Sequence, residues 1–158
     1  MGGISWSDLT ITPDDRALHT LRSAWRWLLG DEWSPLLFSI WGDVFLQRDG
    51  HVHWLNTGTG ELSPVAASEE LFRALLGGDQ VEEWFLPQLV AELHRLGKRP
   101  RAGECFTYAI LPIFAEGKYE AWNFAPVPAW QHFECSGEVY QQIAELPDGT
   151  SVEMCIID

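Results

Sequence analysis

Three features of the sequence predict an α+β fold. Apolar residues recur at helical spacing in some stretches, and in others they form near-continuous runs broken by glycine-containing turns. Hydrophobic residues make up 46% of the 158 residues, with nine tryptophans, which indicates a packed core. The sequence therefore predicts a single domain over residues 1–158, with an antiparallel sheet of about five to six strands packed by three to four helices.

The first helix is expected to begin at Thr12. Thr12 is the predicted N-cap, Pro13 takes the first helical position, and two aspartates follow where the helix dipole favours negative charge. Gly30 is the predicted end of the helix. The predicted core face consists of Leu18, Leu21, Trp25 and Leu28.

The pattern of apolar residues and turns over residues 35–66 predicts a three-stranded meander. Their apolar residues run almost without interruption, and Asp49–Gly50 is a strong hairpin-turn signal. A second turn is expected over residues 57–60, which read Thr-Gly-Thr-Gly.

Two helices are expected next. Ser68 is the predicted cap of a short helix from Glu69 to about Leu76, and Pro87 divides a second helical stretch over residues 79–96. Residues 104–127 then predict a hairpin turning at residues 115–118, with Pro112 at an edge or a bulge. A helix from residue 129 and a last strand over residues 151–158 complete the expected order.

The charge is strongly negative and uneven. Ten Lys and Arg stand against 23 Asp and Glu, a formal net charge of −13, and from residue 102 onward Lys118 is opposed by nine acidic residues. Such a field repels nucleic acid and anionic membranes and attracts cationic partners, so we expect neither DNA or RNA nor a membrane as a direct partner. The sequence has no membrane-spanning apolar run and no signal segment, so a cytoplasmic location is expected.

The helix expected from residue 129 carries an acidic stripe. If the segment is helical, one face is apolar, and the other carries side chains that repel one another with no Lys or Arg nearby. We hypothesise that this stripe contacts a protein partner; the alternative is a solvated face that serves solubility. The stripe consists of Glu134, Glu138, Gln141, Glu145 and Asp148.

A second acidic set is a weaker candidate for partner binding. It consists of Glu69, Glu70, Glu82 and Glu83. Glu69 and Glu70 are also the residues that a first helical turn favours for its dipole. Trp84, Trp122 and Trp130 are further candidates for interface anchors, although most of the tryptophans are needed in the core.

No motif predicts catalysis, and we expect neither an enzyme nor a cofactor. The chain lacks a Gly-x-Ser-x-Gly nucleophile turn and a phosphate-binding glycine loop. His51 and His53 lie on the same side of a predicted strand and could bind one metal ion, but two ligands are too few. A third ligand would have to come from His94, His132 or a carboxylate, and nothing in the sequence indicates which. No metal site is therefore predicted. The cysteines Cys105, Cys135 and Cys155 are expected to be reduced, buried thiols.

Three segments together resemble a known family. Residues 41–62 carry an aromatic-Gly-Asp strand with its Asp-Gly turn, residues 103–127 open with Gly-x-Cys-aromatic, and residues 137–150 end in Leu-Pro-x-Gly-Thr. Over about residues 37–152 the chain resembles the C-terminal domain of type VI secretion system DNase-immunity proteins, formerly a domain of unknown function. Where that family has paired glycines in the second hairpin, this chain has Glu116–Gly117.

The resemblance implies an immunity protein that binds and neutralises a cognate antibacterial toxin, a basic nuclease domain, in the cytoplasm of the producing cell. An acidic partner can occupy the surface that a nuclease presents to DNA, so no catalytic residue is needed. Two alternatives remain open. One is an adaptor that pairs its sheet edge with an extended strand, and the other is a small metal-dependent hydrolase using His51 and His53.

Overall fold

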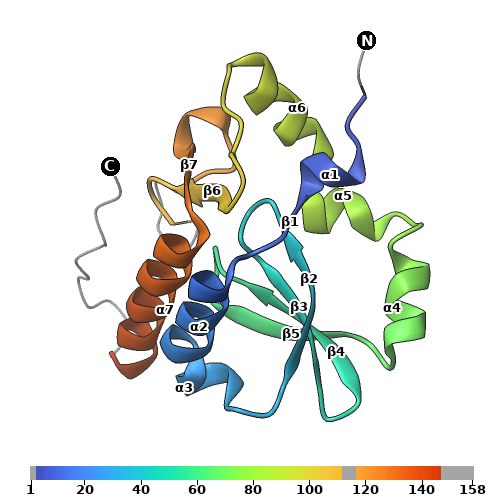
Figure 1. Ribbon diagram of the computed structural model, residues 1–158, viewed down its shortest axis with the longest axis vertical. Helices are drawn as coiled ribbons and strands as arrows, with labels where there is room; N and C mark the ends of the chain where they lie inside the picture. Colours follow the sequence, from blue (N-terminus) through green and yellow to red (C-terminus); the bar gives the residue numbers. More distant parts are fainter. Residues whose placement is uncertain (1–2, 112–116, 147–158) are drawn as a thin grey trace.

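The computed structural model describes residues 3–111 and 117–146, and it confirms the α+β class (Figure 1). A five-stranded antiparallel sheet lies at the centre, and a two-stranded sheet lies beside it. The predicted turn at residues 115–118 falls partly outside the described residues, and Pro112, Asp148, Cys155 and the predicted last strand fall wholly outside them.

The described residues form seven α-helices, one short 3₁₀-helix and seven strands. The helices are α1 (Trp6–Leu9), α2 (Asp15–Ala24), α3 (Arg26–Leu29), α4 (Glu69–Leu75), α5 (Gln80–Phe85), α6 (Pro87–Arg95), the 3₁₀-helix (Ala121–Asn123) and α7 (Ala129–Glu145). The strands are β1 (Thr10–Ile11), β2 (Ser34–Ser39), β3 (Val44–Arg48), β4 (His51–Asn56), β5 (Glu61–Ala66), β6 (Glu104–Tyr108) and β7 (Phe124–Pro128). The short elements α1 and β1 were not predicted.

The main sheet has the strand order β1-β2-β3-β4-β5, and each neighbouring pair is antiparallel. The Asp49–Gly50 turn is confirmed: both residues have positive φ, 55° and 80°, as a two-residue type I′ hairpin turn requires. The meander has four strands where three were predicted, because the apolar run turns at Gly42, with φ 78°. The continuous hydrophobicity on both sides of Gly42 hid this turn.

The later hairpin does not extend the main sheet. β6 and β7 pair with each other in a separate two-stranded sheet, from Glu104 opposite Pro128 to Tyr108 opposite Phe124. One backbone bond, from Phe106 N to Ile40 O at 2.7 Å, ties this hairpin to the end of β2. The prediction of one sheet holding both segments was therefore wrong.

Local signals fixed most helix ends. Ser68 caps α4 by accepting a bond from Leu71 N at 3.2 Å, Gly30 ends α3 with φ 72°, and Pro87 opens α6. The predicted cap Thr12 was wrong: Asp14 caps α2 instead, accepting from Ala17 N at 2.8 Å. An aspartate two residues further on supplies the same kind of acceptor oxygen.

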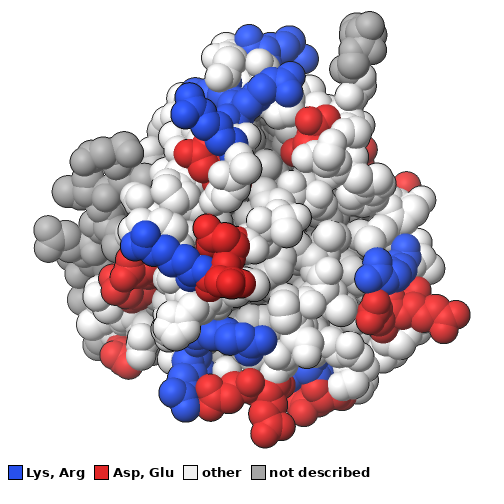
Figure 2. Space-filling model, in the orientation of Figure 1, with Lys and Arg blue, Asp and Glu red and all other residues white. Residues whose placement is uncertain are grey.

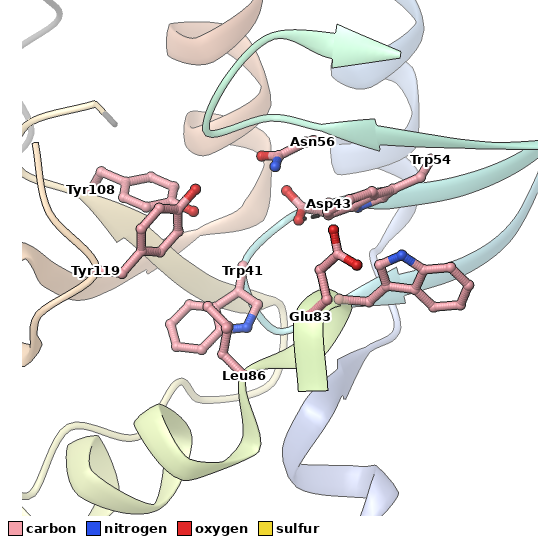
Figure 3. A pocket seen from close by; sticks show the side chains of 9 residues that line it. Trp41, Asp43, Trp54, Asn56, Glu83, Leu86, Tyr108 and Tyr119 are labelled. Atoms are coloured by element: carbon pink, nitrogen blue, oxygen red, sulfur yellow. Dashed lines mark hydrogen bonds between the residues drawn. The ribbon is translucent and has the colours of Figure 1, made fainter. Parts of the chain in front are cut away.

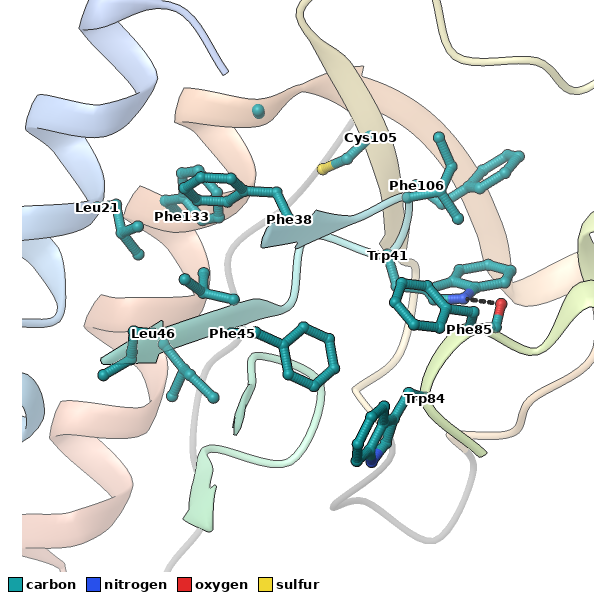
Figure 4. Close-up of a cluster of buried hydrophobic side chains, with 14 of the residues drawn as sticks. Leu21, Phe38, Trp41, Phe45, Leu46, Trp84, Phe85, Cys105, Phe106 and Phe133 are labelled. Carbon is teal, nitrogen blue, oxygen red and sulfur yellow. Dashed lines mark hydrogen bonds between the residues drawn. The ribbon is translucent and has the colours of Figure 1, made fainter. Parts of the chain in front are cut away.

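The buried side chains form one connected cluster between the main sheet, the hairpin and helices α2, α5 and α7 (Figure 4). Its centre is rich in aromatic rings, including Trp41, Phe45, Phe85, Phe106 and Phe133. The indole N–H of Trp41 donates to the carbonyl of Phe85 at 2.7 Å, which joins the β2–β3 turn to the end of α5. No helix in the described residues is long and apolar enough to cross a membrane.

Candidate functional site

The acidic stripe lies on the exposed face of α7. Glu134, Glu138, Gln141 and Glu145 are all exposed, while the opposite face buries Phe133, Gly137 and Tyr140 among other residues. Among the described residues the ion pairs are Arg26–Asp31 and Arg73–Glu69, so no stripe residue takes part in one. The stripe thus presents unpaired carboxylates along the helix, and its predicted last member, Asp148, lies outside the described residues.

A shallow groove runs along the stripe between α2 and α7. Glu134, Glu138 and Gln141 line one side, and His19 and Thr20 of α2 are on the other. The two helices lie side by side in Figure 1. These three members of the stripe therefore form one wall of a surface depression.

The second acidic set divides between two places. Glu69 is paired with Arg73 in α4 at 2.9 Å, as a helix-dipole role allows, and Glu70 is exposed. Glu83 lines a pocket beside the main sheet, and Glu82 lines the adjoining groove between α5, α6 and Tyr119. The structure thus brings Glu83 into this pocket and Glu82 into the adjoining groove, while Glu69 and Glu70 line neither.

This pocket, called the aromatic pocket below, is the most distinctive concave feature of the described residues (Figure 3). It holds about 280 Å³ and lies where the main sheet, α5 and the β6–β7 hairpin meet. Five of its nine residues are aromatic and two are acidic, and none is Lys, Arg or His. They are Trp41, Asp43, Trp54, Asn56, Glu83, Trp84, Leu86, Tyr108 and Tyr119.

Asp43 is a buried carboxylate on the wall of this pocket, with 3% of its surface exposed. Its Oδ1 accepts bonds from Thr57 N at 2.9 Å and Thr57 Oγ1 at 3.0 Å, and its Oδ2 accepts a longer one from Trp54 Nε1 at 3.3 Å. Burial raises the pKa of Asp43 to about 7, because desolvation outweighs these donors. Figure 3 shows the Glu83 carboxylate pointing toward it.

Behind Asp43 lies a buried polar network. Thr57 Oγ1 lies 2.7 Å from His132 Nε2, and Thr107 Oγ1 lies 2.8 Å from His132 Nδ1. Burial lowers the pKa of His132 to about 4, so the imidazole is neutral at pH 7. In a consistent assignment Thr107 donates to Nδ1, Nε2–H donates to Thr57, and Thr57 donates to Asp43. His132 is 1% exposed, so its ring is not accessible to a ligand. Its hydrogen bonds connect α7 to Thr57 and to Thr107 of β6 inside the protein.

The other histidines do not assemble into a site. His51 is exposed, with Nδ1 3.0 Å from the carbonyl of Asp49, and His53 is half-buried. Within residues 3–111 and 117–146, no three His, Cys, Asp or Glu side chains are arranged to hold a metal ion. Burial raises the pKa of the Cys105 thiol well above its usual range, which keeps it protonated.

On the face shown in Figure 2, acidic and basic groups lie beside one another at several places, and one basic patch lies at the top. A basic patch covers the end of α6 and the segment after it, where Arg95, Lys98, Arg99 and Arg101 follow one another. The excess of acidic residues therefore does not form one continuous acidic surface on this face.

Sequence reasoning missed the aromatic pocket. One signal was present: Asp43 is a carboxylate between Trp41 and a run of apolar strand residues, and a charged residue in such a run needs a partner or a function. Tyr108 and Tyr119 gave no such signal, because they reach the pocket only through the fold of the hairpin segment.

No protein-family model matches the chain, and no curated protein sequence is similar to it. Among solved structures, the fold is similar to the crystal structure of Atu4351 from Agrobacterium tumefaciens, with a TM-score of 0.50 and 14% sequence identity. The match covers 82% of this chain, which spans 65% of the length of that one. At this identity the likeness shows the fold alone.

Proposed function

We propose that this protein is an immunity-type inhibitor that binds a cationic toxin domain, a nuclease of a type VI secretion system, in the cytoplasm. The observation that carries the proposal is the row of exposed, unpaired carboxylates Glu134, Glu138 and Glu145 on α7. The net charge of −13 and the family resemblance of residues 37–152 support it. Inhibition needs no catalytic group on this chain.

The mechanism is occlusion of the DNA-binding surface. A nuclease must present basic side chains to the phosphate backbone, so an acidic helix competes for the same surface. Complementary charge also accelerates encounter, by roughly 10- to 1000-fold at low salt. Arginines or lysines arriving at the groove relieve the repulsion between Glu134 and Glu138, which lie one helical turn apart.

The test is co-purification with the product of the adjacent reading frame, followed by a DNA-cleavage assay of that product with and without this protein. We expect a one-to-one complex in which cleavage is silenced. A neighbouring nuclease that neither binds nor loses activity contradicts the proposal.

The role of the stripe is tested by a double variant, Glu134→Lys with Glu138→Lys, which reverses the charge at both positions. We expect association with the toxin to slow by about 10-fold or more at low salt, with little change in the dissociation rate. The matched control is Asp79→Lys with Glu92→Lys, which changes the net charge equally on exposed residues before α5 and in α6, outside both acidic sets. Equal slowing by both variants, or by neither, removes the stripe from the interface.

The two alternatives predict other results. An adaptor would bind an extended strand at the β5 edge of the main sheet, which has no partner strand among the described residues, but Pro64 lies in β5 and has no N–H to donate. A hydrolase using His51 and His53 would contain stoichiometric metal after purification.

A further inference from the structure

We propose that the aromatic pocket receives an arginine side chain of the protein partner. Its guanidinium would lie against the aromatic walls and form hydrogen bonds with the carboxylates of Asp43 and Glu83. This inference deepens the proposed function by naming an anchor contact separate from the α7 stripe.

The lining is selective for a cation. Aromatic faces attract a positive charge, and both charged residues of the pocket are acidic. Asp43 retains acceptor capacity, because its Oδ2 accepts only the 3.3 Å bond from Trp54 among the described residues. A cation entering the pocket would therefore find a buried carboxylate that is not saturated.

The shape favours arginine over lysine. A planar guanidinium stacks on aromatic rings and donates to carboxylates in a fixed fork, whereas an ammonium does neither. The volume of 280 Å³ lies just below the roughly 300–1,000 Å³ of pockets for drug-sized ligands, which suits a single long side chain.

The walls of the pocket are held in place by contacts within the protein. Trp54, Trp84 and Phe45 contact one another, with ring centroids 5.0 to 6.3 Å apart, and Trp41 is fixed by its bond to Phe85. Tyr119, which also lines the pocket, is 45% exposed. Rigid walls reduce the entropy lost on binding, as is typical of pockets that hold interface anchors.

Binding should depend on pH. Because burial raises the pKa of Asp43 to about 7, a guanidinium that favours the carboxylate releases a proton near neutral pH. The ionisable groups around Asp43 are Cys105, Tyr108, Tyr119 and Tyr140, with Glu83 on the same pocket and His132 beyond Thr57. The thiol, the tyrosines and His132 stay neutral near pH 7, so they do not contribute to this pH dependence.

The test is an NMR titration of the isolated protein with N-acetyl-arginine methylamide, following the indole N–H signals of Trp41, Trp54 and Trp84. We expect saturable shifts with millimolar affinity that strengthens as the pH rises through about 7, and no shifts with the uncharged citrulline analogue. Glu83→Gln should weaken binding by about 3- to 10-fold, and Asp43→Asn should abolish the pH dependence. Glu82→Gln, one residue away but lining the adjoining groove, is the matched control and should change affinity less than about twofold.

Equal shifts with the arginine and citrulline probes, equal effects of Glu82→Gln and Glu83→Gln, or no saturable shift at all would each overturn the inference. This titration needs no toxin, so its result is independent of the proposed function. In the toxin complex, Glu83→Gln should mainly raise the dissociation rate, whereas the α7 variant slows association. The two ideas can therefore fail separately.

Discussion

Thr57 is the residue on which the buried polar groups depend. Its Oγ1 lies within 3.1 Å of the carbonyl of Gly42, the carboxylate of Asp43 and the ring of His132. These partners belong to the β2–β3 turn and to α7, so one hydroxyl connects the main sheet to the C-terminal helix. Gly42 is required at this point, because a Cβ there would overlap the His132 ring.

Thr57→Val should lower the free energy of unfolding by about 1–3 kcal/mol. The change preserves shape but leaves His132 Nε2 without its partner in a buried site. Urea denaturation measures the loss.

Thr59→Val is the matched control, because Thr59 Oγ1 is buried with no hydrogen-bond partner among the described residues. Its replacement should be neutral or stabilising. If both variants lose the same stability, the network contributes nothing specific.

At the scale of elements, the contact between α2 and α7 depends on a glycine inside a helix. A Cβ at Gly137 would lie 2.7 Å from the Cβ of Ala24 and 2.5 Å from its carbonyl oxygen. Glycine usually weakens a helix, so its presence here reflects the close approach of the two helices that form the groove.

Gly137→Ala should therefore destabilise the protein by about 1–3 kcal/mol, although alanine favours a helix by about 1 kcal/mol. Thermal or urea unfolding provides the measurement. Gly77→Ala is the control: its Cβ would meet only Ala74 O, at an ordinary 3.6 Å. A stabilised Gly137→Ala variant would show that α2 and α7 can separate without cost.

For the whole molecule, two buried groups oppose each other in the dependence of stability on pH. His132 has a folded pKa of about 4 against 6.5, so the unfolded chain binds the extra proton and stability falls as pH drops through this range. Asp43 has a folded pKa of about 7 against 3.8, so the folded chain keeps the proton and stability falls as pH rises between these values. Between about pH 4 and 6.5 the two effects largely cancel.

Asp43→Asn removes the contribution of Asp43 to the pH dependence of stability and leaves that of His132. The stability of the variant relative to the unmodified protein should rise between about pH 4 and 7, by on the order of 4 kcal/mol, and should be constant above. Urea denaturation at a series of pH values gives the difference, in which the exposed carboxylates common to both proteins cancel. Parallel curves would show that Asp43 is ionised in the folded protein across the range.

The sequence by itself determined the features that depend on neighbouring residues. The Asp49–Gly50 turn, the Ser68 cap, the Gly30 helix end and the break at Pro87 each follow from local backbone geometry or a local hydrogen bond. The exposed side of α7 also followed from helical spacing, which placed Glu134 opposite the buried residues.

Only the tertiary structure decided which segments pair with one another and which side chains meet in the aromatic pocket. The turn at Gly42 and the separation of the β6–β7 hairpin from the main sheet depend on packing between distant segments, which a continuous apolar run does not encode. The aromatic pocket joins residues from Trp41 to Tyr119, and the burial of His132 depends on partners 25 and 75 positions away. Periodicity reports which face of an element is buried, but not which other element buries it, and that contact sets the pKa of Asp43 and the shape of the site.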